Sequence, residues 1–276
     1  MLLARRIALR LDSRQICFRR YHDSLNGSVN ARAYLVRQGI FAVTVSGLAF
    51  AASAVYKTEQ QLGGVRRFWN KVQSYGSVGQ TLARETTPTH TIIGINTAIF
   101  GAWIYAQTPA GSYSALRNVL ESSFTSRLFS PRGLPMLLSS FSHASLGHFL
   151  MNNIALHSFG RISERMLSPP TMAATFVAGG TLSSYGANIY NYIRRGPGYA
   201  RGGMGSSGAL LTFLAISSTI PGPIIHPIGL PMLAVSGLQA VCLISAIDVV
   251  GLVRGWTMIG HAAHLSGTLF GLWIAY

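Results

Sequence analysis

Acidic residues are scarce in this sequence. Only 7 of its 276 residues are aspartate or glutamate, against 22 lysines and arginines, and charged residues together make up 11%. Soluble domains have about 25% charged residues, so this composition argues against one. Long uncharged stretches separate the seven acids, as in proteins that cross a membrane several times.

Cysteine is also scarce, and the basic residues are not grouped as nucleic-acid-binding proteins group them. Of the two cysteines, Cys17 lies near the N-terminus and Cys242 in an apolar segment, which argues against a disulfide framework and a cysteine metal site. The net charge of +15 comes from arginines in the N-terminal segment and in short loops, with no basic stripe interleaved with aromatics. We therefore expect contact with the lipid bilayer, no nucleic-acid partner, and no metal or cofactor.

The N-terminus explains part of the positive charge. Residues 1–22, MLLARRIALRLDSRQICFRRYH, contain six arginines and a single acid, Asp12. On a helix, these arginines and the apolar residues between them form the amphipathic, acid-poor segment that is typical of a mitochondrial transit peptide. We assign the transit peptide to residues 1–25. A solvated basic tail is the alternative.

Seven segments are apolar enough, and long enough or nearly so, to cross the hydrocarbon core, for which a helix needs about 20 residues. They are Gly39–Tyr56, Thr91–Gln107, Ala144–Gly160, Thr171–Ile193, Met204–Ile220, Met232–Val253 and Met258–Tyr276. A connection that contains three prolines, Thr108–Ser142, separates the second from the third. We expect an all-α polytopic membrane protein, with an N-terminal segment over 26–90 that includes a transmembrane helix over 39–56, and a core over 91–276.

The segment GGMGSSGALL, residues 202–211, contains two overlapping signatures. Gly203, Gly205 and Gly208 form G-x-G-x-x-G, the pattern of a dinucleotide-binding turn, and G-x-S-G surrounds Ser207. A dinucleotide turn requires a preceding strand and an acid about 20 residues further on, whereas here a polar loop precedes and the next acid is Asp248. The context therefore favours a role for Ser207, either as a nucleophile or as the small packing residue that most serines in membrane helices are.

A serine nucleophile needs a base within hydrogen-bonding distance, and the last apolar segment contains two histidines. In GHAAHLSGTLFG, His264, Gly267 and Gly271 share one helix face, and the glycine pair lets another helix approach closely. If the helix that begins at Ser207 docks there, its hydroxyl meets the His264 imidazole, which accepts a proton near neutral pH. His261 is the rival base. Glycine packing beside an incidental histidine is the alternative without chemistry.

Two other apolar segments contain further candidates. His148 and Asn152, in FSHASLGHFLMNN, are four residues apart, so they project from one helix face, and both can donate hydrogen bonds. Polar side chains at that depth need partners, so each is a candidate oxyanion donor or an interhelical hydrogen bond. Asp248 is the one carboxylate in a predicted span. It could complete a triad with His264, but we expect it to cap a helix end, pair with Arg254 or hydrogen-bond a neighbour.

Three motifs together resemble the rhomboid intramembrane serine proteases, in their order and in the helices that carry them. They are H-x-x-x-N at His148–Asn152, G-x-S-G at Gly205–Gly208 and A-H-x-x-G-x-x-x-G at Ala263–Gly271. The segment IIGINTAIFGAW resembles that family's first core helix, so the resemblance covers about 91–276. The extra N-terminal span and the leader resemble the mitochondrial, presenilin-associated rhomboid-like type. The resemblance implies a six-helix rhomboid core with one extra N-terminal transmembrane helix, in the mitochondrial inner membrane.

The resemblance also implies a mechanism. Ser207 is expected to be the nucleophile and His264 the general base of a Ser–His dyad, with His148, Asn152 and the Ser207 N–H as the oxyanion hole. The expected substrates are single-span membrane proteins cleaved in or near their transmembrane segment, and mitochondrial relatives are associated with a dynamin-like GTPase. Two alternatives stay open. A non-catalytic rhomboid-like protein that binds transmembrane clients would be expected to lack Ser207 or His264, and a small transporter would be expected to have two symmetric halves.

The number of spans also predicts an orientation. Seven crossings place the termini on opposite sides of the membrane, and a transit peptide places the N-terminus in the matrix. The loop Arg194–Gly203 and the turn at Arg254 then face the matrix, and so does the opening of the site around Ser207. Beyond the leader, the basic residues are biased only nine to seven toward the matrix side, so the expectation depends on the count of spans and on the leader.

Overall fold

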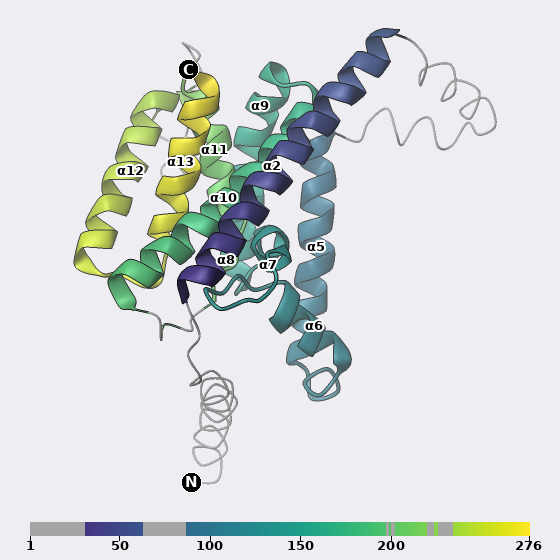
Figure 1. The fold of residues 1–276 in the computed structure, drawn as a ribbon. Helices are drawn as coiled ribbons and strands as arrows, with labels where there is room; N and C mark the ends of the chain where they lie inside the picture. Colours follow the sequence, from purple (N-terminus) through teal and green to yellow (C-terminus); the bar gives the residue numbers. More distant parts are fainter. Residues whose placement is uncertain (1–30, 63–86, 197–198, 200–201, 220–223, 226–233) are drawn as a thin grey trace, which may run out of the picture.

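The computed structural model describes residues 31–62, 87–196, 199, 202–219, 224–225 and 234–276, which form a bundle of helices (Figure 1). The predicted transit peptide over 1–25 lies outside the described residues, as does most of the polar stretch after the first long helix. The elements are α2 (Ala31–Leu62), α5 (Pro88–Gln107), α6 (Ala115–Ser123), α7 (Leu134–Leu138), η1 (Ser139–Phe141), α8 (Leu146–Ala155), η2 (Leu156–Gly160), α9 (Arg161–Met166), α10 (Pro169–Arg195), α11 (Ser207–Ser217), β1 (Ile224–Ile225), β2 (Val235–Ser236), α12 (Gly237–Arg254) and α13 (His261–Ala275).

Each of the seven predicted apolar segments contains a helix. The third is divided into α8 and the π-helical segment η2, and α9 follows directly after it. The connection over 108–142 contains two short helices, α6 and α7, and the 3-10 turn η1. Among the described residues, the strands β1 and β2 form a two-residue antiparallel pair, in which Ile224 lies opposite Ser236.

Local signals in the sequence set where several helices begin and end. The Ser145 hydroxyl accepts the His148 N–H at the start of α8, and Ser236 and Gln239 form a capping box at the start of α12. Helix α12 ends at Gly255, in the left-handed conformation that glycine adopts without strain. A carboxylate on α9 caps α5 from outside: Glu164 accepts the Thr89 N–H at 3.0 Å, in the first turn of α5.

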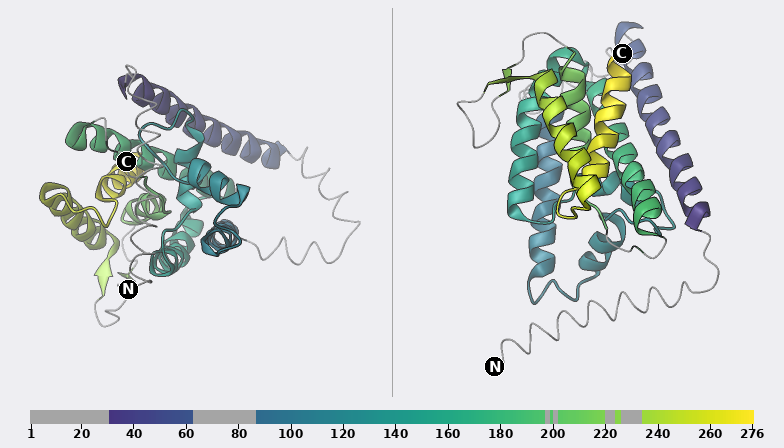
Figure 2. Two further views of the ribbon diagram at one scale, coloured as in Figure 1. Left: turned by 90° about the horizontal axis from the view of Figure 1, so that it is seen from below. Right: turned by 90° about the vertical axis from the view of Figure 1, so that its left-hand side faces the viewer.

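Helix α11 lies at the centre of the bundle. It packs against α10, α13 and α12, and every residue from Gly208 to Ser217 is buried. Its two sides contribute to two apolar clusters, one with Phe176 of α10 around Phe213 and one with Val241 of α12 around Leu214. With 11 residues, α11 is shorter than α10, α12 and α13. The helix therefore begins inside the bundle, and its first residue, Ser207, is half-buried. Figure 2 shows α11 enclosed by its neighbours in two further views.

The extra helix α2 packs along α10 (Figure 1). Its one strongly buried amide, Gln38, is 1% exposed and donates to the carbonyls of Arg127 at 3.1 Å and Leu128 at 2.9 Å. Asn188 of α10 donates to Gln38 Oε1 at 2.9 Å and to Ser126 Oγ at 3.4 Å. Gln38 therefore joins three parts of the molecule: α2, α10 and the connection that precedes α7.

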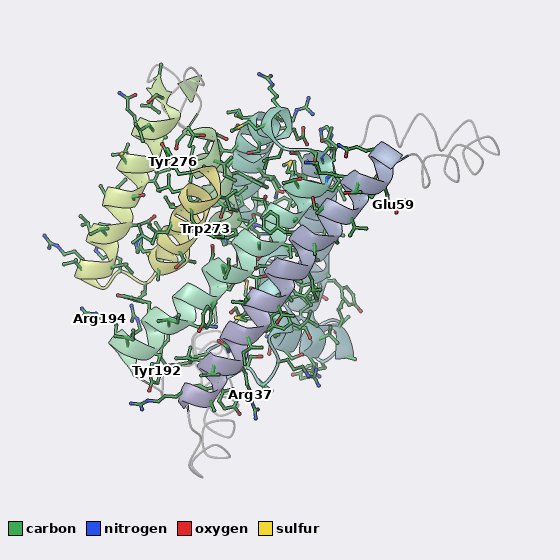
Figure 3. The ribbon with its side chains drawn as sticks, turned by 45° about the horizontal axis from the view of Figure 1, so that its top comes forward. Arg37, Glu59, Tyr192, Arg194, Trp273 and Tyr276 are labelled. Atoms are coloured by element: carbon green, nitrogen blue, oxygen red, sulfur yellow. The ribbon has the colours of Figure 1, made fainter. Side chains whose placement is uncertain are left out.

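Two described helical segments, Arg32–Gln61 and Gly237–Arg254, are long and apolar enough to cross a membrane by length and composition. The count of seven crossings therefore stays a prediction. Figure 3 shows Arg37, near the start of α2, at the same end of the molecule as Tyr192 and Arg194 of α10, and Glu59 toward the other end. This is the arrangement that the predicted orientation requires, because it assigns Arg37 and Arg194 to the same side of the membrane.

Candidate active site

The segment that leads into α11 is held at two points. The backbones of Ser126 and Gly203 exchange two hydrogen bonds, of 2.9 and 2.8 Å, and the Gly205 N–H donates to the Ser139 carbonyl at 2.9 Å. Gly205 has φ +133°, which glycine adopts far more readily than residues with a side chain. The turn therefore delivers Ser207 to the first position of α11, where its N–H has no intrahelical partner.

Helices α11 and α13 are in backbone contact at the glycine pair. A Cβ at Gly267 would lie 2.8 Å from the Gly208 carbonyl carbon, and closer still to its oxygen. One turn further, Gly271 has no side chain where the Thr212 backbone approaches. The Thr212 hydroxyl donates to the Gly267 carbonyl at 2.9 Å and so links the two helices. The helix that begins at Ser207 thus docks on the glycine face, as the sequence predicts.

This contact brings Ser207 and His264 together. Ser207 Oγ lies 2.9 Å from His264 Nε2, within hydrogen-bonding distance, and the His264 side chain is 15% exposed. Both residues are half-buried. A hydroxyl that donates to an unprotonated imidazole nitrogen is the arrangement in which a serine can be activated as a nucleophile. No hydrogen bond between His261 and Ser207 appears among the described residues.

His261 and His264 both face Asp248, which projects from α12. Asp248 Oδ1 lies 2.6 Å from His261 Nδ1 and 3.1 Å from His264 Nδ1. We expected Asp248 to cap a helix end, pair with Arg254 or hydrogen-bond a neighbour. Only the last describes what is seen, because Asp248 lies a turn and a half before the end of α12 and bonds two histidines on α13. Ser207, His264 and Asp248 therefore lie in a row.

The His148 ring lies against the turn at Gly205. A Cβ at Gly205 would lie 2.7 Å from His148 Cε1, 2.8 Å from its Nε2 and 3.9 Å from Ser207 Oγ. The ring therefore fills the space that a side chain at position 205 would need. The Ala144 N–H donates to His148 Nδ1 at 3.5 Å, which favours the neutral form with hydrogen on Nε2. The nitrogen next to the Gly205–Ser207 turn is then a hydrogen-bond donor.

Asn152 lies beside the same turn, one helical turn below His148. It is 4% exposed, and its Nδ2 donates to the His148 carbonyl at 2.8 Å. The Ser206 hydroxyl donates to Asn152 Oδ1 at 3.3 Å and also lies 3.3 Å from His143 Nε2. Asn152 is therefore held next to Ser207 through the preceding serine, and its second amide hydrogen is available to a further acceptor.

Comparison with known proteins agrees with this arrangement of helices. The family profile of the Rhomboid domain matches residues 131–276, more than half of the chain. The chain belongs to the rhomboid family. This membership places it among the rhomboid-type intramembrane proteases and rhomboid-like proteins, and its fold is that of an all-α polytopic membrane protein.

The relatives of this rhomboid are mitochondrial. It is 34% identical over 186 residues to presenilin-associated rhomboid-like protein A, mitochondrial, of Danio rerio, covering 66% of this chain and 45% of that protein. The protein of the same kind from Homo sapiens is 29% identical over 260 residues, covering 87% and 65%. Rhomboid protein 1, mitochondrial, of Saccharomyces cerevisiae is 26% identical over 190 residues, covering 66% and 51%. The chain spans about half to two thirds of the length of these relatives, whose names agree with the predicted mitochondrial localisation.

Sequence reasoning missed two polar residues of this rhomboid site. Ser206 and His143 are both buried. The doubled serine of GSSG and the histidine five residues before His148 are the sequence signals that could have indicated them. Asn153, the residue after Asn152, accepts a hydrogen bond from Asn96 of α5 at 3.1 Å. That bond joins α5 to α8 and does not involve Ser207.

Proposed function

We propose that this protein is an intramembrane serine endopeptidase of the mitochondrial inner membrane, which cleaves single-span membrane proteins in or near their transmembrane segment. The observation that carries the proposal is the 2.9 Å distance between Ser207 Oγ and His264 Nε2, on two helices whose backbones touch. A mitochondrial dynamin-like GTPase belongs to the class of substrate that this proposal covers.

The proposed reaction begins when Ser207 Oγ attacks a peptide carbonyl carbon and His264 Nε2 takes the hydroxyl proton. The negative charge that develops on the carbonyl oxygen is stabilised by hydrogen bonds from His148 Nε2, Asn152 Nδ2 and the Ser207 N–H. His264 then passes its proton to the leaving amine nitrogen as the peptide bond breaks. Water, deprotonated by His264, hydrolyses the acyl-enzyme and restores the Ser207 hydroxyl.

The substrate must offer an unwound backbone, because a helix keeps its carbonyls in internal hydrogen bonds. A transmembrane segment with small or helix-breaking residues meets this requirement at low cost. The polar residues around the Gly205–Ser207 turn supply the hydrogen-bonding groups that an unwound segment needs inside the membrane. A non-catalytic rhomboid that binds transmembrane clients is the second candidate. Client binding alone does not require the Ser207 hydroxyl and the His264 imidazole to lie within hydrogen-bonding distance.

The test uses detergent-purified protein, a fluorophosphonate probe and cleavage of a single-span reporter. We expect wild type to be labelled and to cleave, and Ser207→Ala and His264→Ala each to lose cleavage while eluting as folded protein. Gly101→Ala, on an exposed position of α5 with no atom within 4 Å of the added Cβ, is the matched control. Cleavage by Ser207→Ala within tenfold of wild type would refute the proposal.

A further inference from the structure

One carboxylate oxygen is shared by two imidazoles where α12 meets α13. Asp248 Oδ1 is the atom that both His261 Nδ1 and His264 Nδ1 approach. The side chains of Asp248 and His261 are 3% and 1% exposed, and within the described residues Asp248 Oδ2 and His261 Nε2 have no hydrogen-bond partner. The site just described uses His264 but assigns nothing to this buried carboxylate or to the second histidine.

Two ring nitrogens this close to one oxygen restrict where the protons lie. A nitrogen without hydrogen would point its lone pair at the lone pairs of the oxygen. An ionised Asp248 satisfies both contacts if each imidazole donates through Nδ1–H. A protonated carboxyl can also satisfy both contacts, because its one hydrogen can go to one ring while the same oxygen accepts from the other. The ionised form has two N–H donors, which pair a buried charge that would otherwise be costly, and in that form His264 carries its hydrogen on Nδ1.

This arrangement decides what His264 presents to Ser207. A neutral imidazole that carries its hydrogen on Nδ1 has its lone pair on Nε2, which is the atom 2.9 Å from Ser207 Oγ. That form accepts the serine proton, and the other neutral form does not. When the proton arrives, the ring becomes an imidazolium whose charge lies next to the Asp248 carboxylate.

His261 is in turn held in place from α12. Gly251 has no side chain where the His261 ring lies, because a Cβ there would overlap the ring. The Trp256 ring packs on His261 with 5.9 Å between centroids. The imidazole is thus fixed by the same helix that carries Asp248, and its 2.6 Å contact fixes the carboxylate oxygen that His264 uses.

We propose that Asp248 and His261 are positioning residues for His264. Asp248 holds His264 in the form with hydrogen on Nδ1 and stabilises the imidazolium, and His261 holds Asp248 by donating to the same oxygen. The inference rests on the proposed function for its effect on rate, and it extends that function from a two-residue arrangement to a four-residue one.

Asp248→Asn tests the carboxylate, because it keeps the shape and removes the charge. The corresponding change in a soluble serine protease lowers kcat by roughly 10⁴, and we expect a loss of at least about 10²-fold in kcat here, with KM within about threefold of wild type. A merely structural role for Asp248 would leave kcat near wild type, because asparagine still accepts a hydrogen bond. Asp248→Asn with kcat within threefold of wild type, in a preparation whose Ser207→Ala variant is inactive, would overturn the positioning role and leave the proposed function standing.

His261→Gln and His261→Leu test the second histidine as a pair. Glutamine can donate an amide hydrogen to Asp248 Oδ1 and leucine cannot. We expect His261→Gln to stay within about tenfold of wild type and His261→Leu to fall at least tenfold below His261→Gln, with both eluting as folded protein. Equal loss in both folded variants would overturn the proposal and indicate His261 as a chemical base. Wild-type activity in His261→Leu would overturn it as well.

A third measurement does not depend on proteolysis. In protein labelled with ¹⁵N-histidine, the His264 resonances, identified by their loss in His264→Ala, report which ring nitrogen carries hydrogen. We expect hydrogen on Nδ1 in wild type and a mixture of both neutral forms in Asp248→Ala. Hydrogen predominantly on Nε2 in wild type would overturn the proposal whether or not the protein cleaves a substrate. If wild type and Ser207→Ala cleave equally, the proposed function fails, and this measurement alone decides the positioning role.

Discussion

Replacing Gly267 by alanine should separate the two helices that carry the serine and the histidine. The added Cβ would lie 2.8 Å from the Gly208 carbonyl carbon, whereas ordinary van der Waals contact begins at 3.4 Å. Helices α11 and α13 must therefore move apart by at least the difference, 0.6 Å. The atom in conflict belongs to the backbone of α11, so rotation of a flexible side chain cannot relieve it.

Moving the two helices apart would also lengthen the contact between Ser207 and His264. An added 0.6 Å would lengthen the 2.9 Å contact between Ser207 and His264 to about 3.5 Å, the limit of a hydrogen bond. A misplacement of about 1 Å can cost roughly 10²-fold in rate, so we expect Gly267→Ala to lower kcat about 10- to 100-fold. Overpacking also costs about 1–3 kcal/mol of stability.

The assay is cleavage of a single-span reporter together with fluorophosphonate labelling, on protein that elutes as folded. Gly101→Ala is the control, because the same substitution there meets nothing within 4 Å. We expect labelling and cleavage to fall together in Gly267→Ala and to be unchanged in Gly101→Ala. A folded Gly267→Ala protein with wild-type kcat would show that the close approach of α11 and α13 does not set the geometry of the site.

Four further predictions concern other parts of the molecule. Asn152→Ala should lower kcat by roughly 10²–10³ without abolishing labelling, as expected for the loss of one oxyanion donor; an unchanged kcat would assign Asn152 to packing. Gln38→Leu removes three hydrogen bonds and leaves the buried Leu128 carbonyl without its donor, at about 1–3 kcal/mol, so the thermal unfolding temperature in detergent should fall clearly below that of wild type, whereas Gly47→Ala on the exposed face of α2 should not lower it. Burial opposes ionisation of Glu164, but the polar groups of Thr87 and Thr89, including the Thr89 N–H that donates to the carboxylate, and the neighbouring Arg161 guanidinium outweigh it and lower the pKa of this carboxyl. Its stabilisation is therefore present above the unfolded pKa of about 4.3 and lost as pH falls through the folded value, and Glu164→Gln should flatten the acid side of the thermal stability profile. A tag after Tyr276 should be digested in mitoplasts whose outer membrane alone is ruptured, and a protected tag would contradict the predicted orientation.

The class of the fold can be predicted from the amino-acid sequence. Apolar segments of spanning length, with few acids between them, predict helices without reference to any partner, because a membrane leaves the backbone no other way to satisfy its hydrogen bonds. Each of those segments contains a helix among the residues that the structure describes. Spacing also predicts a close-packing face on α13 beside His264, since a glycine pair one turn apart creates a smooth face wherever the helix lies. The pairing of that histidine with Ser207 comes from the resemblance of the three motifs, because spacing alone does not say which helix docks on the face.

The partners of the buried polar residues could not be predicted from the sequence, because they depend on how the helices pack. Asp248 and His264 are 16 residues apart and lie on different helices, so no spacing rule predicts that they meet. From the sequence, a triad with His264 was only the less favoured alternative to a helix cap, a pair with Arg254 or a hydrogen bond to a neighbour. Spacing likewise does not predict the contact of Gln38 with Asn188, which are 150 residues apart, or that of Ser206 with His143. A helical period fixes which residues of one helix share a face, but the rotation of each helix against its neighbours is set by the packing of the whole bundle. That rotation brings one carboxylate oxygen of Asp248 to both histidines of α13.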